Sequence, residues 1–166
     1  IFHHNLGHDM IKIFDLDGTV IDSSHRQTRS EGGTLSLSSW KRNSTPEMIA
    51  LDKLLPLAKQ MRLHYNKGQI TLVCTAREMA LEDYYYLGSN GLFAHAILSR
   101  PSGNDAPDAP LKIALLHDWA KKHGYTWERF CSTAIMYDDN ISVINSLTFR
   151  GLRCYNSTIL NRELSQ

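Results

Sequence analysis

Residues 10–14 form an apolar run that stops abruptly at the polar sequence Asp15-Leu-Asp17-Gly-Thr. A run of this kind, followed by Asp and Gly, predicts a buried strand that enters a tight loop. Two later apolar runs end in a similar way: residues 70–74 precede Thr75, and residues 133–137 precede Asp138 and Asp139. The repetition favours a sheet whose strands end in chemically capable side chains.

Helix-like segments separate these apolar runs. The sequence predicts helices over residues 46–65 (with a break at Pro56), 78–89, 111–122 and 141–149, and further strands over residues 94–98 and 152–155. Strands that alternate with helices imply parallel βαβ units, and continuously apolar strands suit a sheet covered on both faces. We therefore predict an α/β fold, a Rossmann-like three-layer α/β/α sandwich around a mainly parallel sheet.

The length of 166 residues fits a single domain, which we assign to residues 10–166. Residues 1–9 carry three histidines and are interpreted as a leader or tag-like tail, with a metal site as the alternative. Residues 22–45 are polar and predict a flap or minimal cap, too short for a large cap domain. The last eleven residues are expected to form a peripheral tail.

Composition narrows the class of function. The chain has 18 Lys and Arg against 17 Asp and Glu, so its net charge gives no strong attraction for polyanions. No apolar run has the length of a membrane span. The three cysteines have no zinc-site spacing, and Cys74 is expected to be a buried free thiol. A reducing compartment, the cytoplasm, is the simplest location.

The polar ends of parallel strands meet at one edge of a sheet, where ligands bind. Asp15, Asp17, Asp138 and Asp139 would therefore gather there and repel one another, and a divalent cation would relieve the repulsion. Mg²⁺ prefers oxygen ligands and often binds carboxylates together with a substrate phosphate. The sequence thus predicts a magnesium site that includes Asp15 with Asp138 or Asp139.

The same residues suit phosphate-ester hydrolysis. Asp15 can act as a nucleophile through an aspartyl-phosphate, and Asp17 can protonate the leaving oxygen and then activate water. Lys112, at the start of a helix, would offset charge on the phosphoryl oxygens and on Asp15. The Thr75 hydroxyl would hydrogen-bond the same oxygens.

Phe14-Asp15-Leu-Asp17-Gly-Thr19 resembles the first motif of the haloacid dehalogenase (HAD) superfamily, and Thr75, Lys112 and Asp138-Asp139 are similar to its second, third and fourth motifs in order. The resemblance implies a HAD-like fold with little or no cap domain, Mg²⁺, and the roles given above. It also implies metal ligation by Asp15, by the backbone carbonyl of Asp17, and by Asp138 and Asp139. Because dehalogenases of the superfamily lack the second aspartate, Asp17 favours phosphate chemistry.

A narrower resemblance concerns Thr75-Ala-Arg77-Glu and Ser99-Arg100-Pro-Ser-Gly. These segments look like parts of the phosphatase domain of polynucleotide kinase-phosphatases, which remove 3′-phosphates from nucleic-acid ends. The resemblance implies that Arg77 and Arg100 bind substrate. The phosphate loop of the kinase half is absent from the sequence.

Several residues keep a second interpretation. Asp138 and Asp139 suit a helix N-cap, Thr75 suits a cap, and Lys112, Arg77 and Arg100 suit solvated surface charges. Asp22 suits a structural loop role. Two of the three tyrosines at positions 84–86 are expected in the core, although they could also stack on bases. The flap offers further groups for a nucleotide, namely His25, Arg26, Arg29, Trp40, Lys41 and Arg42.

The predicted function is a Mg²⁺-dependent phosphomonoesterase that acts on nucleic-acid 3′-phosphate ends or nucleotides. The alternatives are a small-molecule phosphatase, such as a nucleotidase or sugar phosphatase, and a non-catalytic phosphate-binding protein.

Overall fold

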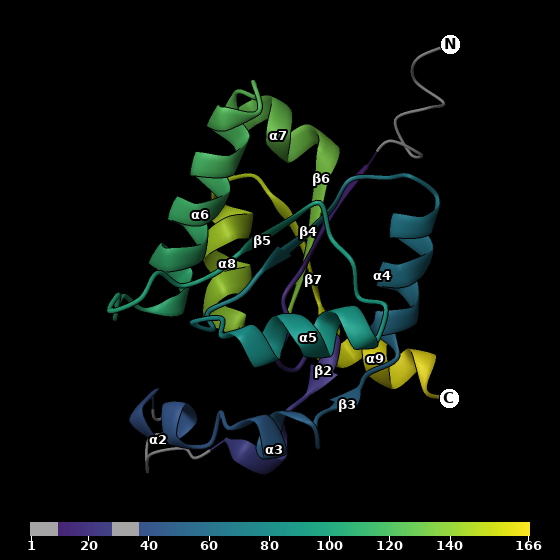
Figure 1. Ribbon diagram of the computed structural model, residues 1–166. Coiled ribbons are helices and arrows are strands. Elements are labelled where there is room, and N and C mark those ends of the chain that lie inside the picture. The colour runs from purple at the N-terminus through teal and green to yellow at the C-terminus, as the bar shows by residue number, and fades with distance from the viewer. Residues whose placement is uncertain (1–9, 28–36) are drawn as a thin grey trace.

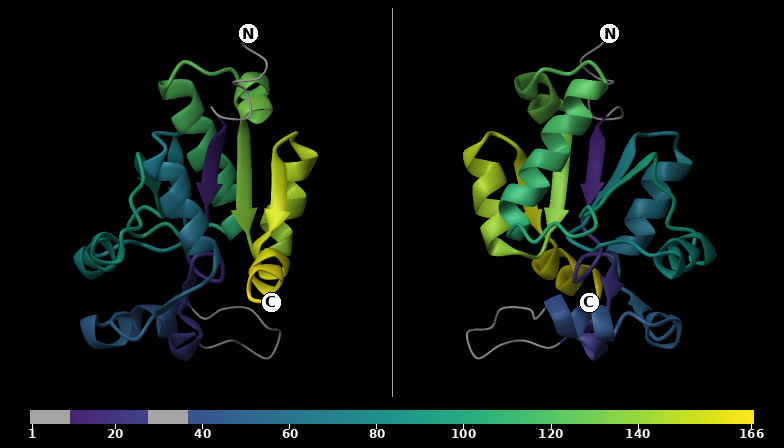
Figure 2. Two further views of the ribbon diagram at one scale, coloured as in Figure 1. Left: turned by 90° about the vertical axis from the view of Figure 1, so that its right-hand side faces the viewer. Right: turned by 60° about the vertical axis from the view of Figure 1, so that its left-hand side comes forward.

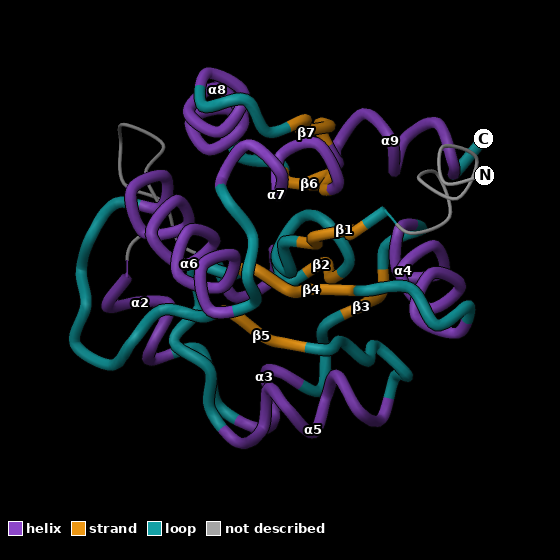
Figure 3. The backbone as a smooth tube through the Cα atoms, turned by 90° about the horizontal axis from the view of Figure 1, so that it is seen from above, coloured by secondary structure: helices purple, strands orange, loops and turns teal. Residues whose placement is uncertain are grey.

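The computed structural model describes residues 10–27 and 37–166. Within this part of the chain, five parallel strands form a central sheet in the spatial order β5-β4-β1-β6-β7. The strands are β1 (Ile11–Phe14), β4 (Thr71–Cys74), β5 (Ala96–Leu98), β6 (Ala134–Asp138) and β7 (Arg153–Asn156). Strand β1, the first strand in the described residues, therefore lies in the middle of the sheet, as Figure 3 shows.

Helices cover both faces of this sheet (Figure 3). On one side lie α4 (Leu57–Asn66), α5 (Leu81–Ser89) and α9 (Ser157–Leu164); on the other lie α6 (Asp108–Lys122) and α8 (Ile141–Phe149). The short helix α7 (Trp127–Thr133) leads directly into β6. The predicted three-layer α/β/α sandwich is confirmed.

Two hydrophobic clusters lie on opposite faces of the sheet. Because successive side chains of a strand point to opposite faces, Ile13 joins Leu116 and Val143 in the cluster under α6 and α8. Its neighbour Phe14 joins Met61 of α4 and Leu87 of α5 in the other cluster. Each such buried side chain contributes roughly 1.5–3 kcal/mol of transfer free energy, so both faces fix the central strand.

An insert spans residues 23–52, and its described residues, 23–27 and 37–52, lie beyond the carboxyl ends of the strands (Figures 1 and 2). Its base is closed by antiparallel pairing of β2 (Ile21–Asp22) with β3 (Lys53–Leu54). Its described part holds η1 (Ser24–Arg26), α2 (Leu37–Arg42) and α3 (Pro46–Ile49). Thr45 caps α3 as expected, since its Oγ1 accepts a 3.3 Å hydrogen bond from the Met48 N–H. The insert continues to residue 52, whereas the flap was predicted over residues 22–45.

Some elements differ from the predictions. Helix α5 begins at Leu81 rather than at residue 78, and α7 was not expected. The expectation of a peripheral C-terminal tail is wrong, because α9 packs against α4, β6 and β7. Buried Cys74 is a free thiol, as predicted. The interpretation of residues 1–9 and the role of Arg29 fall outside the described residues. No helix in the described ranges has the length and apolar character of a membrane span.

Candidate active site at the carboxyl edge of the sheet

Asp15 and Asp138 lie side by side because they end neighbouring parallel strands. The β1–β6 register pairs Phe14 with Tyr137, one residue before each aspartate. Lys112 reaches both carboxylates from the first turns of α6: its Nζ donates to Asp15 Oδ1 at 3.0 Å and to Asp138 Oδ2 at 2.6 Å. All three residues are buried. Lys112 is therefore not a surface lysine.

Asp139 completes this group, which we call the lysine cluster (Asp15, Lys112, Asp138 and Asp139). Carboxylate oxygens of its three aspartates lie within 4.8 Å of one another. The Asp139 carboxylate also approaches Gly18, where an added Cβ would collide with it. Gly18 has φ +80°, a conformation that side chains other than glycine rarely adopt. The motif glycine thus serves both the turn and the approach of Asp139.

The lysine cluster holds three carboxyl groups and one ammonium group. Burial raises the pKa of Asp15 well above its usual range, and the Asp138 carboxylate raises this pKa further, whereas Lys112 lowers it. Burial also raises the pKa of Asp139. Burial alone would lower the pKa of Lys112, but Asp15 and Asp138 outweigh it and raise this pKa. One ammonium therefore does not balance the three carboxylates.

The donor set of this cluster fits a hard divalent cation. Its ligand atoms are carboxylate oxygens, the type that Mg²⁺ prefers. The excess of negative charge in a buried position gives a cation a direct electrostatic benefit. The helix-cap interpretation of the paired aspartates is wrong, because Asn140 caps α8 with its own side chain and Asp138 Oδ1 accepts from the Asn140 N–H at 2.9 Å.

The first motif's loop is held by the C-terminal helix, which the sequence did not predict. Ser157 Oγ lies 2.8 Å from the Thr19 hydroxyl, and Asn161 Nδ2 donates to the Thr19 carbonyl at 2.9 Å. Asn161 Oδ1 also accepts from the Leu57 N–H, at the start of α4, at 2.8 Å. Buried Asn161 thus joins the Asp15 loop to α4. Little in the sequence indicated this anchoring, because the two side chains of α9 that provide it are polar.

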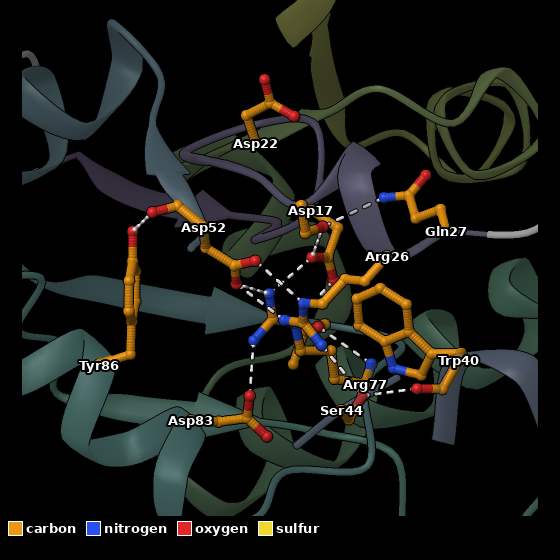
Figure 4. A network of polar contacts seen from close by, with 12 residues as sticks. Asp17, Asp22, Arg26, Gln27, Trp40, Ser44, Asp52, Arg77, Asp83 and Tyr86 are labelled. Atoms are coloured by element: carbon orange, nitrogen blue, oxygen red, sulfur yellow. Dashed lines mark hydrogen bonds and ion pairs between the residues drawn. The ribbon is translucent and has the colours of Figure 1, made fainter. Parts of the chain in front are cut away.

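Asp17 faces a different group of residues from Asp15 (Figure 4). Arg77 Nε donates to Asp17 Oδ2 at 2.8 Å and Arg77 Nη2 to Oδ1 at 2.6 Å, while Ser23 Oγ donates to Oδ1 at 2.5 Å. Burial acts to raise the pKa of Asp17, but Arg77 and Ser23 outweigh burial and lower it. Asp17 is therefore a carboxylate at neutral pH.

Arg77 is the centre of a buried arginine network, which consists of Arg26, Arg77, Asp17, Asp52 and Asp83 (Figure 4). Its Nη1 donates to Asp83 Oδ1 at 2.8 Å and its Nη2 contacts Asp52 Oδ2 at 3.4 Å. Burial opposes the charged form, but these carboxylates outweigh it and raise the pKa of Arg77. Arg77 is not a solvated surface charge, and no spacing rule in the sequence could have linked it to Asp52.

Thr75 and Arg100 are also buried and hydrogen-bonded within the protein. Thr75 Oγ1 accepts from the Arg77 N–H at 3.0 Å, which orders the loop after β4. Arg100 donates to the carbonyls of Ala76, Asn104 and Ala106 at 2.7–2.9 Å and to Asp108 at 3.2 Å. Arg100 thus organises the loop that leads to Lys112, and it is not a surface charge.

Several of the remaining candidates contact other groups of the protein. Trp40 is buried, and the Arg26 guanidinium lies 4.3 Å from its ring centroid, so this face is not open for stacking. Asp22 accepts from the Ser24 N–H and hydroxyl, which is a loop role. The expectation of two core tyrosines is wrong. Tyr84 and Tyr85 are exposed, whereas half-buried Tyr86 donates to the Asp52 carbonyl at 2.9 Å.

Other flap cations lie at the rim of the insert. Lys41 Nζ pairs with Glu78 Oε2 at 3.3 Å, and most of the Lys41 side chain is exposed. His25 Nε2 lies 2.9 Å from the Met48 carbonyl and 3.5 Å from Asp52 Oδ1. Arg42 donates to the Ser39 hydroxyl at 3.0 Å. These contacts tie parts of the insert to one another and to the loop after β4.

Comparison with solved structures identifies the fold. The HAD-like hydrolase SP0104 of Streptococcus pneumoniae matches with a TM-score of 0.61 at 14% identity, over 94% of this chain and 92% of that one. A Geobacter sulfurreducens HAD-superfamily hydrolase gives 0.63 at 14% identity, covering 89% and 88%. A chain of a Pnkp1/Rnl/Hen1 complex gives 0.64 at 18% identity, covering 89% and 45%. These likenesses show a HAD-like fold.

Comparison with known sequences identifies the family. The 5′-deoxynucleotidase of Escherichia phage T5 is 41% identical over 86 residues, which are 49% of this chain and 35% of that protein. The matched region of the chain thus covers about a third of the length of this relative. A family model described as bacteriophage T5 5′-deoxynucleotidase matches residues 4–166. Since that match covers nearly the whole sequence, the chain belongs to the bacteriophage T5 5′-deoxynucleotidase family.

Proposed function

We propose that this protein is a Mg²⁺-dependent phosphomonoesterase that removes the phosphate from deoxynucleoside 5′-monophosphates, with Asp15 as nucleophile. One observation carries the proposal: buried Asp15 ends a central strand beside Asp138 and Asp139 and is paired with Lys112 at 3.0 Å. A carboxylate kept in such a position, next to a cation, is suited to attack a phosphoryl group whose charge the cation offsets.

In the first step, an Asp15 carboxylate oxygen forms a bond to phosphorus as the bond between phosphorus and O5′ breaks. The electron pair of the broken bond stays on O5′, which takes a proton from Asp17 and leaves as the 5′-hydroxyl of the nucleoside. Lys112 stays bound to the other side of Asp15, so it orients the nucleophile and offsets charge near the phosphoryl oxygens. Thr75 orders the adjacent loop after β4.

In the second step, a water molecule attacks the phosphorus of the aspartyl-phosphate. Asp17 takes the proton from this water, the bond between phosphorus and the Asp15 oxygen breaks, and inorganic phosphate leaves. Asp17 thus returns to the protonated form that the first step needs. The lowered pKa of Asp17 keeps this carboxyl ionised, which is the form that can accept a proton in this step. The first step requires that the Arg77 contact loosen enough for Asp17 to hold a proton.

Asp15, Asp138 and Asp139, with the backbone carbonyl of Asp17, would hold the magnesium ion. When bound, it neutralises phosphoryl and carboxylate charge and so lets Asp15 be ionised despite its raised pKa.

The family supports the substrate class, because the phage T5 relative is named a 5′-deoxynucleotidase. Arg77 and Arg100 do not add support to the predicted action on 3′-phosphate ends, because their guanidinium groups are hydrogen-bonded within the protein. We also propose a cytoplasmic setting, which agrees with three free cysteines.

Phosphate release tests the proposal. Purified protein with Mg²⁺ is given the four deoxynucleoside 5′-monophosphates, the matching ribonucleotides, sugar phosphates, and an oligonucleotide with a 3′-phosphate. We expect the 5′-deoxynucleotides to be preferred and EDTA to stop turnover, with recovery when Mg²⁺ is restored. Preference for the 3′-phosphorylated end would favour the earlier prediction. Absence of hydrolysis even of p-nitrophenyl phosphate would favour a non-catalytic phosphate-binding protein.

A further inference from the structure

The arginine network joins the insert to Asp17 through charged side chains (Figure 4). Asp17 belongs to the loop after β1, Arg77 to the loop after β4, and Asp52 and Arg26 to the insert. Arg77 grips both carboxylate oxygens of Asp17, at 2.8 and 2.6 Å. The position of the Asp17 carboxylate therefore follows that of the Arg77 guanidinium.

Two other carboxylates set the orientation of this guanidinium. Asp83 accepts from Nη1 at 2.8 Å and Asp52 contacts Nη2 at 3.4 Å, so Arg77 is held from both sides. Asp83 also caps α5, since its Oδ2 accepts from the Ala80 N–H at 2.9 Å. Asp52 belongs to no helix or strand, and its side chain is completely buried.

Asp52 is fixed in turn by the insert. Arg26 Nε and Nη2 donate to its two oxygens at 2.9 and 2.8 Å, a bidentate pair. Arg26 is itself buried, stacks on Trp40 at 4.3 Å, and donates from Nη1 to Ser44 Oγ at 3.0 Å. A continuous path of hydrogen bonds and ion pairs therefore leads from the insert, through Asp52 and Arg77, to Asp17, and its longest link is the 3.4 Å contact between Asp52 and Arg77.

We infer that Asp52 is a positioning residue, which together with Arg26 sets the place of Asp17 in the reaction through Arg77. Three carboxylates share two guanidinium groups in this network, so Asp52 and Asp17 compete for the same Nη2. Removal of Asp52 leaves the Arg77 fork free to shift toward Asp17 and to hold it more tightly. Asp17 then reaches the leaving oxygen less often, while Asp15 and Lys112 are untouched.

This inference rests on the proposed function and concerns the step in which O5′ leaves. An alkoxide such as O5′ needs the proton from Asp17, because it is a poor leaving anion. The p-nitrophenolate anion is stable in water and can leave without a proton. A misplaced Asp17 should therefore slow deoxynucleotide cleavage and spare p-nitrophenyl phosphate. The ratio of the two kcat/KM values isolates the effect, since kcat/KM reports on steps up to departure of the alcohol.

The test uses Asp52→Asn and the double variant Arg26→Gln with Asp52→Asn, which removes one charge of each sign and so keeps the net charge of the network unchanged. The double variant carries the test if Asp52→Asn alone does not fold. Asp22→Asn is the matched control, because Asp22 contacts Ser24 and not Arg77. For each protein, kcat and KM are measured with a deoxynucleoside 5′-monophosphate and with p-nitrophenyl phosphate, and folding is checked by circular dichroism.

The expected result is a fall of about tenfold or more in kcat/KM for the deoxynucleotide, part of the roughly 10²- to 10⁴-fold that a general acid contributes. The value for p-nitrophenyl phosphate should stay within about threefold, the deoxynucleotide loss should appear in kcat rather than KM, and Asp22→Asn should match wild type.

An equal fall in kcat/KM for both substrates would assign Asp52 a purely structural role and overturn the inference. Wild-type values of kcat/KM for both substrates would also overturn it. Failure of the proposed function looks different, because wild-type protein would then leave deoxynucleotides intact.

Discussion

Two ionic clusters at the same edge of the sheet differ in their balance of charge. The lysine cluster sets three carboxylates against one ammonium, whereas the arginine network sets three carboxylates against two guanidinium groups. Burial and like charge raise the pKa of Asp15, but Arg77 lowers the pKa of Asp17, two residues along the chain. The comparison teaches that neighbouring aspartates of one motif receive different chemistry from their partners. Asp15 shares one ammonium with two other carboxyl groups, whereas both oxygens of Asp17 are held by the Arg77 guanidinium.

The largest effect is expected from Asp15→Asn, which changes the lysine cluster and leaves the arginine network intact. The amide cannot form an aspartyl-phosphate, so we expect kcat for a deoxynucleotide to fall by at least about 10⁴-fold. Phosphate release with Mg²⁺ measures the loss, and thermal unfolding checks that the fold is intact. The control Asp118→Asn, an exposed residue paired with Lys122, should stay within about twofold. Near-normal turnover by Asp15→Asn would refute the nucleophile assignment.

Loss of the single ammonium should destabilise the lysine cluster. Lys112→Met leaves buried carboxylates without a cation, and we expect a loss of roughly 3–5 kcal/mol in the free energy of unfolding, measured by urea titration without Mg²⁺. The matched control is Lys122→Met, whose partner pair is exposed and whose cost should be below about 1 kcal/mol. Similar costs for the two variants would mean that Lys112 is no more important to the fold than a surface lysine.

Magnesium should stabilise one cluster and not the other. At a concentration a hundredfold above its Kd, Mg²⁺ should add about 2.7 kcal/mol to the free energy of unfolding, seen as a higher Tm. Asp139→Asn should weaken this response, because it removes one of the three grouped carboxylates. Asp52→Asn, within the arginine network, should keep it. An equal loss of response in both variants would argue against a metal site at the lysine cluster.

The smallest effects, on the order of 1 kcal/mol, concern stability as a function of pH without Mg²⁺. A carboxyl with a lowered pKa stabilises the fold above its unfolded pKa and loses this contribution as pH falls through its folded pKa. Asp17→Asn should therefore flatten the acid limb of the stability curve.

Asp15 has the opposite sign, because its pKa is raised. Its ionisation destabilises the metal-free fold, and the penalty sets in as pH rises from the unfolded pKa to the folded pKa. Asp15→Asn should thus stabilise the metal-free protein at neutral pH and have little effect at pH 3. Urea midpoints at a series of pH values measure both variants, and curves that shift in the same direction would remove the contrast between the clusters.

Much of the fold could be predicted from local patterns. The limits predicted for α8 agree with the observed Ile141–Phe149, and β1 and β4 were found from their apolar runs. Helix α9 was missed, and its two buried side chains, Ser157 and Asn161, are polar, so its anchoring contacts carry no apolar signal in the sequence. The gathering of Asp15, Lys112, Asp138 and Asp139 was also predictable, because parallel strands place their ends together.

The partners of Asp17 could not be predicted in the same way. Asp52 lies 25 residues before Arg77, and long-range contacts such as the pairing of β2 with β3 bring the two side chains together. No repeating pattern in the sequence marks a single carboxylate that is buried between two arginines. The apolar residues around Asp52 were the one available hint that this acid is not a surface residue.

The anchoring of Thr19 by Asn161 affects how the site is assembled during synthesis. The loop that carries Asp15 and Thr19 is synthesised before α9, and the side chains that hold this loop belong to residues made about 140 positions after Thr19. Before α9 has been synthesised, a nascent chain would have the Asp15 loop without these anchoring contacts, so we expect catalytic competence to arise only after α9 has emerged from the ribosome. For the same reason, a bulky protein fused close to α9 should disturb the loop after β1 and lower catalytic activity.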